Sequence, residues 1–183
     1  ADLYEVKVTG SVTGLDRPLL VTNLGEGLAF AEADSTGEAR AMAYVGNHIQ
    51  DGIRSWPLGR AEPGVHEGPM LWAAFRSKFF VIALLAGDSE ESVAESEYLG
   101  GLIVSESTLP ERARVAATQT VQTDGTFGYR LFMGPQDYAL LSSLGEDMEE
   151  GDRVAERGAS VTTGLVALLA AVGRSDVLVH ARP

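Results

Sequence analysis

The longest apolar stretch of the chain is residues 70–86, MLWAAFRSKFFVIALLA, and it carries most weight in deciding the fold. Arg76 and Lys78 interrupt it, and it is shorter than the roughly 20 apolar residues that a membrane-spanning helix needs. Residues 79–85 are a continuous run of aromatic and aliphatic side chains, which is typical of a buried strand. The stretch therefore predicts a buried helix followed by a strand, and it argues against a transmembrane segment.

The segment that precedes this stretch, residues 55–69, is rich in proline and glycine. Such residues interrupt regular structure, so the segment predicts a connection between two small lobes, residues 1–54 and 70–183. The first lobe is expected to be a β-β-β-α module, with strands at residues 3–9, 18–22 and 28–32 and a helix from Ser35 to Gly52. One continuous domain remains the alternative.

The part of the chain that follows the apolar stretch mixes both kinds of element. Asp124 and Gly125 form a strong two-residue hairpin signal. The other expected elements are helices at residues 138–144 and 160–172 and a last strand at residues 177–179. The whole pattern predicts an α+β fold, in which amphipathic helices pack on a mixed or antiparallel sheet.

The charge balance restricts the possible partners. The 183 residues include 26 acidic and 14 basic side chains, which gives a net charge of -12. Nucleic-acid binders and polybasic membrane anchors need a basic surface, so we expect no nucleic acid and no membrane as partners. There is no cysteine, and the first residues show no signal peptide. These features favour a soluble protein of the cytoplasm, or a part of an assembled particle.

Two acidic clusters, residues 88–97 and 146–152, are the most obvious candidates for a metal site. Neither follows the alternating order of ligands in an EF-hand loop. The sequence also lacks a zinc motif, a phosphate-binding glycine loop and a nucleophile elbow. We therefore expect exposed acidic loops, with no metal and no cofactor.

Histidines supply the only candidates for catalysis. His48 has Asp51 one helical turn away in the expected helix, and the neighbours His66 and Glu67 form a titratable pair in the proline- and glycine-rich segment, near Trp72. An exposed helix end for His48 and a polar loop for His66 and Glu67 are the simpler explanations. The missing motifs favour a protein that is not an enzyme, with His66, Glu67 and His48 as the candidate catalytic residues if it is one.

Residues 30–43, FAEADSTGEARAMA, resemble the junction of strand and helix in HicB-like antitoxin modules. Together with the order of strands before them, they extend the resemblance over residues 4–53. It implies a β-β-β-α-β module that, in toxin–antitoxin pairs, covers a toxin that binds RNA. The family's short helical DNA-binding segment has no counterpart here, so no DNA-binding role is implied.

Three hypotheses for the function follow. The first is a non-enzymatic structural subunit that associates with itself, as a homo-oligomer, or binds another protein. The second is a HicB-like antitoxin or an immunity-type protein, whose acidic surface binds a basic toxin. The third is an enzyme for a small molecule, with its site near His66 and Glu67.

Overall fold

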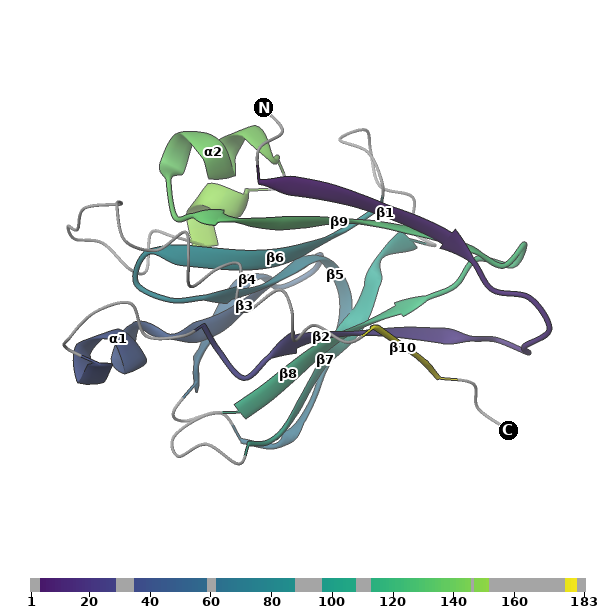
Figure 1. Cartoon of the computed structure of the whole chain (residues 1–183), viewed down its shortest axis with the longest axis horizontal. Helices are drawn as coiled ribbons and strands as arrows, with labels where there is room; N and C mark the ends of the chain where they lie inside the picture. Colours follow the sequence, from purple (N-terminus) through teal and green to yellow (C-terminus); the bar gives the residue numbers. More distant parts are fainter. Residues whose placement is uncertain are drawn as a thin grey trace.

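The computed structural model describes residues 4–28, 35–58, 62–87, 97–107, 113–145, 147–151 and 177–180. These residues form a strongly curled antiparallel sheet with short helices at its border (Figure 1). Its elements are β1 (Glu5–Ser11), β2 (Leu19–Gly25), α1 (Ser35–Ala41), β3 (Ala43–His48), β4 (Gly52–Pro57), β5 (Gly64–Arg76), β6 (Phe80–Ala86), β7 (Leu99–Glu106), β8 (Ala113–Thr120), β9 (Thr126–Pro135), α2 (Tyr138–Ser143), the 3-10 turn η3 (Met148–Gly151) and β10 (Val177–His180).

The long strand β5 divides the sheet into two layers. Its residues 72–76 pair with β6 and with β3, whereas its residues 64–67 pair with β7. The first layer has the order β1-β9-β6-β5-β3-β4 and the second has the order β5-β7-β8-β2-β10. The register of β5 shifts between Glu67 and Met70, so the strand passes from one layer to the other at that point.

Glycine allows β5 and β7 to approach each other closely at this crossing. Gly101 of β7 has a φ of +150°. A side chain at that position would collide with the carbonyl oxygen of His66. A side chain at Gly68 would lie 2.5 Å from the carbonyl oxygen of Leu99. The change of layer therefore depends on two positions without a Cβ atom.

The central strand β6 is buried on both faces. Its residues Ile82, Leu84 and Ala86 belong to an inner core between the two layers. Its residues at 81, 83 and 85 belong to an outer core, which α2 and η3 cover through Leu141, Leu144 and Met148. A strand with two covered faces reads as a continuous apolar run, which explains the stretch at 79–86.

A buried ion pair joins the edge strand β1 to this layer. Arg130 of β9 is 1% exposed, and its Nη1 atom lies 3.5 Å from Oε1 of Glu5. The two side chains lie on the outer face, because Glu5 pairs with Phe132 of the outer core. Among the described residues, the Nε and Nη1 atoms of Arg130 and the Oε1 atom of Glu5 have no hydrogen-bond partner, so the pair is an electrostatic contact without a hydrogen bond between these atoms.

The expectation of an α+β fold with packed amphipathic helices is wrong. The helix expected up to Gly52 ends at Ala41, and β3 and β4 follow it. Both faces of β3 are buried, because Tyr44 belongs to the inner core and Val45 to the outer core. Apolar residues therefore do not alternate with polar ones along this strand. The helical spacing of apolar residues in this segment therefore did not indicate a helix. The helix expected at the start of residues 70–86 is wrong for the same reason, because residues 70–76 belong to β5.

Other expectations have mixed outcomes. A tight turn does form at Asp124 and Gly125, where the N–H of Gly125 donates to the carbonyl of Gln122 at 2.9 Å. The strands on either side, β8 and β9, pair with other strands and lie in different layers. The helix expected at residues 160–172, residues 88–96 of the first acidic cluster and most of the strand at 28–32 lie outside the described residues. Residues 147–151 of the second acidic cluster are described, and Met148–Gly151 form η3.

The boundary at residues 55–69 stays a prediction. β4 and β5, at its two ends, both pair with β3 in the first layer. In the described part of the chain, no helix is both long and apolar enough to cross a membrane.

Candidate functional site

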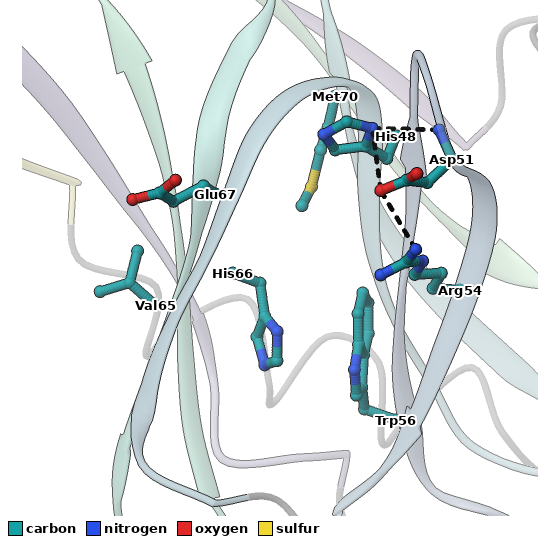
Figure 2. A pocket seen from close by; sticks show the side chains of 8 residues that line it. All are labelled: His48, Asp51, Arg54, Trp56, Val65, His66, Glu67 and Met70. Atoms are coloured by element: carbon teal, nitrogen blue, oxygen red, sulfur yellow. Dashed lines mark hydrogen bonds and ion pairs between the residues drawn. The ribbon is translucent and has the colours of Figure 1, made fainter.

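A cavity of about 320 Å³ lies between the β3–β4 hairpin and the first half of β5. We call it the hairpin pocket. Figure 2 shows it framed on one side by the arch of β5 and on the other by β4. Its lining residues come from both layers of the sheet and are His48, Asp51, Arg54, Trp56, Val65, His66, Glu67 and Met70.

An aromatic cluster closes the inner side of this pocket. The rings of Tyr44 and Trp56 are stacked with their centroids 5.0 Å apart, as expected for opposite residues of β3 and β4. The ring of His66 lies 4.5 Å from that of Trp56. His66, in the part of β5 that belongs to the second layer, therefore contacts Tyr44 and Trp56 of the first layer.

A hydrogen bond fixes the orientation of His66. The hydroxyl of Tyr44 and Nε2 of His66 are 2.9 Å apart. Burial raises the pKa of Tyr44 to about 12 and lowers the pKa of His66 below its ordinary value. Both side chains are then neutral at neutral pH, and the tautomer of the imidazole decides which of the two donates this hydrogen bond.

His48 organises the tip of the hairpin. Its Nδ1 atom accepts hydrogen bonds from the backbone N–H groups of Gln50, at 3.1 Å, and Asp51, at 3.2 Å. The carboxylate of Asp51 lies 3.1 Å from the guanidinium group of Arg54 and 3.7 Å from His48 Nδ1 (Figure 2). The structure therefore gives His48 a clear role in the turn.

The structure brings the three predicted site residues to one pocket, but it does not pair them. His66 projects toward Trp56, whereas Val65 and Glu67 leave the strand on the other side (Figure 2). Neighbouring residues of a strand point to opposite faces, so His66 and Glu67 do not act as a contacting pair. Trp72 is buried in the outer core.

Catalysis by His66, Glu67 or His48 stays a prediction. Among the described residues, no group of three histidine, aspartate or glutamate side chains could hold a metal ion.

The sequence did not show that Tyr44, Arg54 and Met70 belong to this site. Tyr44 fell within the expected helix, and its distance from His66 in the sequence depends on the path of β5. The composition of the pocket suits a peptide-like ligand: Trp56, Val65 and Met70 offer apolar surface, and charged groups surround them.

The family model that matches this chain is that of the YidC periplasmic domain, and it matches residues 4–151. Similar proteins are each described as a membrane protein insertase YidC. That of Chlorobium limicola is 27% identical over 152 residues, and that of Chlorobium luteolum is 28% identical over 160 residues; each alignment covers 80% of this chain and 25% of the relative. That of Syntrophus aciditrophicus is 26% identical over 120 residues, covering 65% and 21%. The chain spans about a quarter of the length of the curated relatives it matches.

These matches correct four expectations. The resemblance of residues 4–53 to HicB-like antitoxins is wrong, because the model for another family covers that segment and most of the chain. The self-associating structural subunit and the antitoxin or immunity protein are wrong for the same reason. The cytoplasmic location is wrong, because the matched family is a periplasmic domain. The expectation of a soluble protein with no membrane partner is wrong, because the relatives are membrane protein insertases.

Charge and hydropathy could not reveal this relationship. An acidic domain outside a membrane has no need of a basic surface or of an apolar helix, so the absence of both in the sequence did not exclude a membrane protein as its context. The match extends over residues 4–151, from the start of β1 to the end of η3. The chain belongs to the YidC periplasmic domain family.

Proposed function

We propose that this chain is the periplasmic part of a membrane protein insertase, and that it transiently binds segments of the inserting protein outside the membrane. The family match supports the context, and the relatives' description as insertases supports the activity. The observation that carries the binding role is the hairpin pocket, which offers apolar and charged groups side by side. Periplasmic segments of membrane proteins contain both kinds of residue.

An insertion assay with a blocked pocket tests this proposal. The full-length insertase that contains this domain is reconstituted in lipid vesicles, and insertion of a single-span protein with a basic periplasmic tail is followed by protection from protease. In the Arg54→Trp variant, a bulky side chain replaces one that is 56% exposed at the pocket. We expect insertion to slow several-fold.

Lys7→Trp is the matched control, because Lys7 is also an exposed cationic residue of an edge strand, on β1 at the other end of the first layer. Insertion by this variant should equal that of the wild type. Equal rates for Arg54→Trp, Lys7→Trp and the wild type would contradict the binding role.

A further inference from the structure

One side of β4 is free in the described structure. β4 pairs with β3 alone, and it ends the first layer. On the other side of the hairpin pocket, residues 64–67 of β5 pair with β7 alone. The pocket therefore lies between the border strands of two layers, and Figure 2 shows the space between them.

The hydrogen-bonding pattern shows which backbone groups of β4 point to the free side. The N–H of Leu58, just beyond β4, donates to the carbonyl of Met42 at 3.0 Å. Bonded and non-bonded pairs alternate in an antiparallel ladder, so Trp56 and Arg54 also bond toward β3. Residues 53, 55 and 57 then point away from β3.

The sequence agrees with this assignment. Pro57 has no N–H group, and a proline is tolerated in an edge strand where its nitrogen faces away from the partner. The free side thus offers the N–H and carbonyl groups of Ile53 and Ser55. Among the described residues, no backbone partner is found for these two N–H groups.

The pocket is arranged to receive the side chains of a strand placed there. Trp56 and Arg54 lie on the inner face of β4, the face shared by Tyr44. Met70 adds apolar surface from β5, and the exposed Val65 lines the pocket from the side of β5 opposite His66. An added strand would direct alternate side chains toward these residues and the others to solvent.

Charge favours a basic occupant. Asp51 and Arg54 neutralise each other at 3.1 Å. Glu67 also lines the pocket and forms no ion pair in the described part of the chain. The charged side chains that line the pocket are therefore two acidic ones and one basic one, with Glu67 on the side of β5 opposite His66, in a chain whose net charge is -12.

We infer that the free side of β4 takes up an extended, basic peptide segment as an added antiparallel or parallel strand, whose inward side chains occupy the hairpin pocket. This inference rests on the proposed function, since it states the form in which the inserting protein is bound. Main-chain hydrogen bonds to Ile53 and Ser55 supply affinity without dependence on sequence, as one domain that handles many proteins requires.

The test measures binding of a capped heptapeptide of alternating valine and lysine to the 183-residue chain. Ser55→Pro removes one outward N–H and should weaken binding by about tenfold, the effect of losing roughly one well-made hydrogen bond. Ser55→Ala keeps the N–H and is the matched control, with affinity near that of the wild type. The same peptide with glutamate in place of lysine should bind more weakly than the lysine peptide.

A second measurement is independent of the stability of the variants. N-methylation of alternate residues of the peptide removes its donors on one side, so binding to the wild-type chain should fall when the methylated side faces β4. Hydrogen exchange at Ile53 and Ser55 should slow when the unmodified peptide is bound. Equal affinity of Ser55→Pro and Ser55→Ala, both folded, or binding that is unaffected by methylation in either frame, would overturn strand addition.

The two proposals can fail separately. If Arg54→Trp slows insertion while methylated and unmodified peptides bind equally, the binding role stands and the strand mode is wrong. If the peptide binds as a strand while Arg54→Trp inserts proteins at the normal rate, strand addition stands and the binding role in insertion is wrong.

Discussion

The contact between Tyr44 and His66 connects the two layers of the sheet at the level of single residues. Their hydrogen bond of 2.9 Å joins β3 to the first half of β5, and the ring of Trp56 packs against both. Burial raises the pKa of Tyr44 and lowers the pKa of His66, so it favours the neutral form of both residues.

Stability should therefore depend on pH through His66. Its pKa is lowered in the folded protein from the ordinary value of 6.5, so at mildly acid pH the unfolded chain binds the proton first. This contribution of His66 to stability is complete above about pH 7, begins to fall below pH 6.5, and is fully lost only once the pH is below the lowered pKa of the folded protein. Urea unfolding at about pH 7.5 and about pH 5.5 measures the difference.

His66→Phe is the control for this prediction, because it keeps an aromatic ring against Trp56 and cannot be protonated. The loss of stability between the two pH values should be smaller in this variant than in the wild type. The assignment to His66 is wrong if both proteins lose the same free energy of unfolding.

The sequence predicted some residues of the pocket but not the residues that they contact. His48, His66 and Glu67 were selected because they titrate, and the structure does place all three at one pocket. Their partners were not accessible, because Tyr44 and His66 are 22 residues apart and meet only through the change of layer in β5. The ion pair of Arg130 with Glu5 was hidden for the same reason, since it depends on the register of β1 and β9.

At the scale of elements, β5 determines the architecture. One strand takes part in both layers, and its crossing is packed against β7 at Gly68 and Gly101. Strands that are covered on both faces lose the alternation of polar and apolar residues, so their sequence resembles that of a buried helix. This is why the strands at 43–48 and 70–76 were expected to be helical, whereas the run at 79–85 was recognised as a strand.

Substitution of Gly101 tests the importance of the crossing. Gly101→Ala places a Cβ atom against the carbonyl oxygen of His66 at a φ of +150°. We expect the free energy of unfolding to fall by about 3 kcal/mol, the upper part of the range for single substitutions. Denaturant unfolding of the purified chain measures the change.

Gly14→Ala separates the steric effect from the backbone effect. Gly14 has a positive φ of +79°, but in the described part of the chain no atom beyond its two chain neighbours lies within 4 Å of the position of its Cβ. The free energy of unfolding should fall by about 1 kcal/mol, the usual cost of replacing a glycine in this conformation. Equal losses at both positions would show that the contact between β5 and β7 adds nothing.

At the scale of the whole molecule, composition excluded less than it suggested. The net charge of -12 argued against nucleic acid, and no comparison contradicts that expectation. The same charge was taken to argue against a membrane, yet the chain belongs to a family of periplasmic domains whose matched relatives are membrane insertases. A domain outside the bilayer takes its composition from the water around it, so its charge says little about the membrane beside it.

Under the proposed function, the location of the pocket defines the side of the domain on which binding is expected. The pocket is at the border where β4 ends one layer and β5 begins the other, and its lining residues Trp56 and Met70 connect it to the inner core. Binding at such a border can add a strand without opening the core. This arrangement predicts that contacts with an inserting protein concentrate on one side of the domain.

Photo-crosslinking in the full-length insertase tests this claim most directly. A photoreactive amino acid replaces Val65, which is 65% exposed at the pocket, and in a second protein it replaces Leu15, which is 44% exposed and does not line the pocket. During insertion of a membrane protein with a basic periplasmic segment, position 65 should crosslink to that segment and position 15 should not. Crosslinks of equal yield at both positions, or none at position 65, would contradict binding in the hairpin pocket.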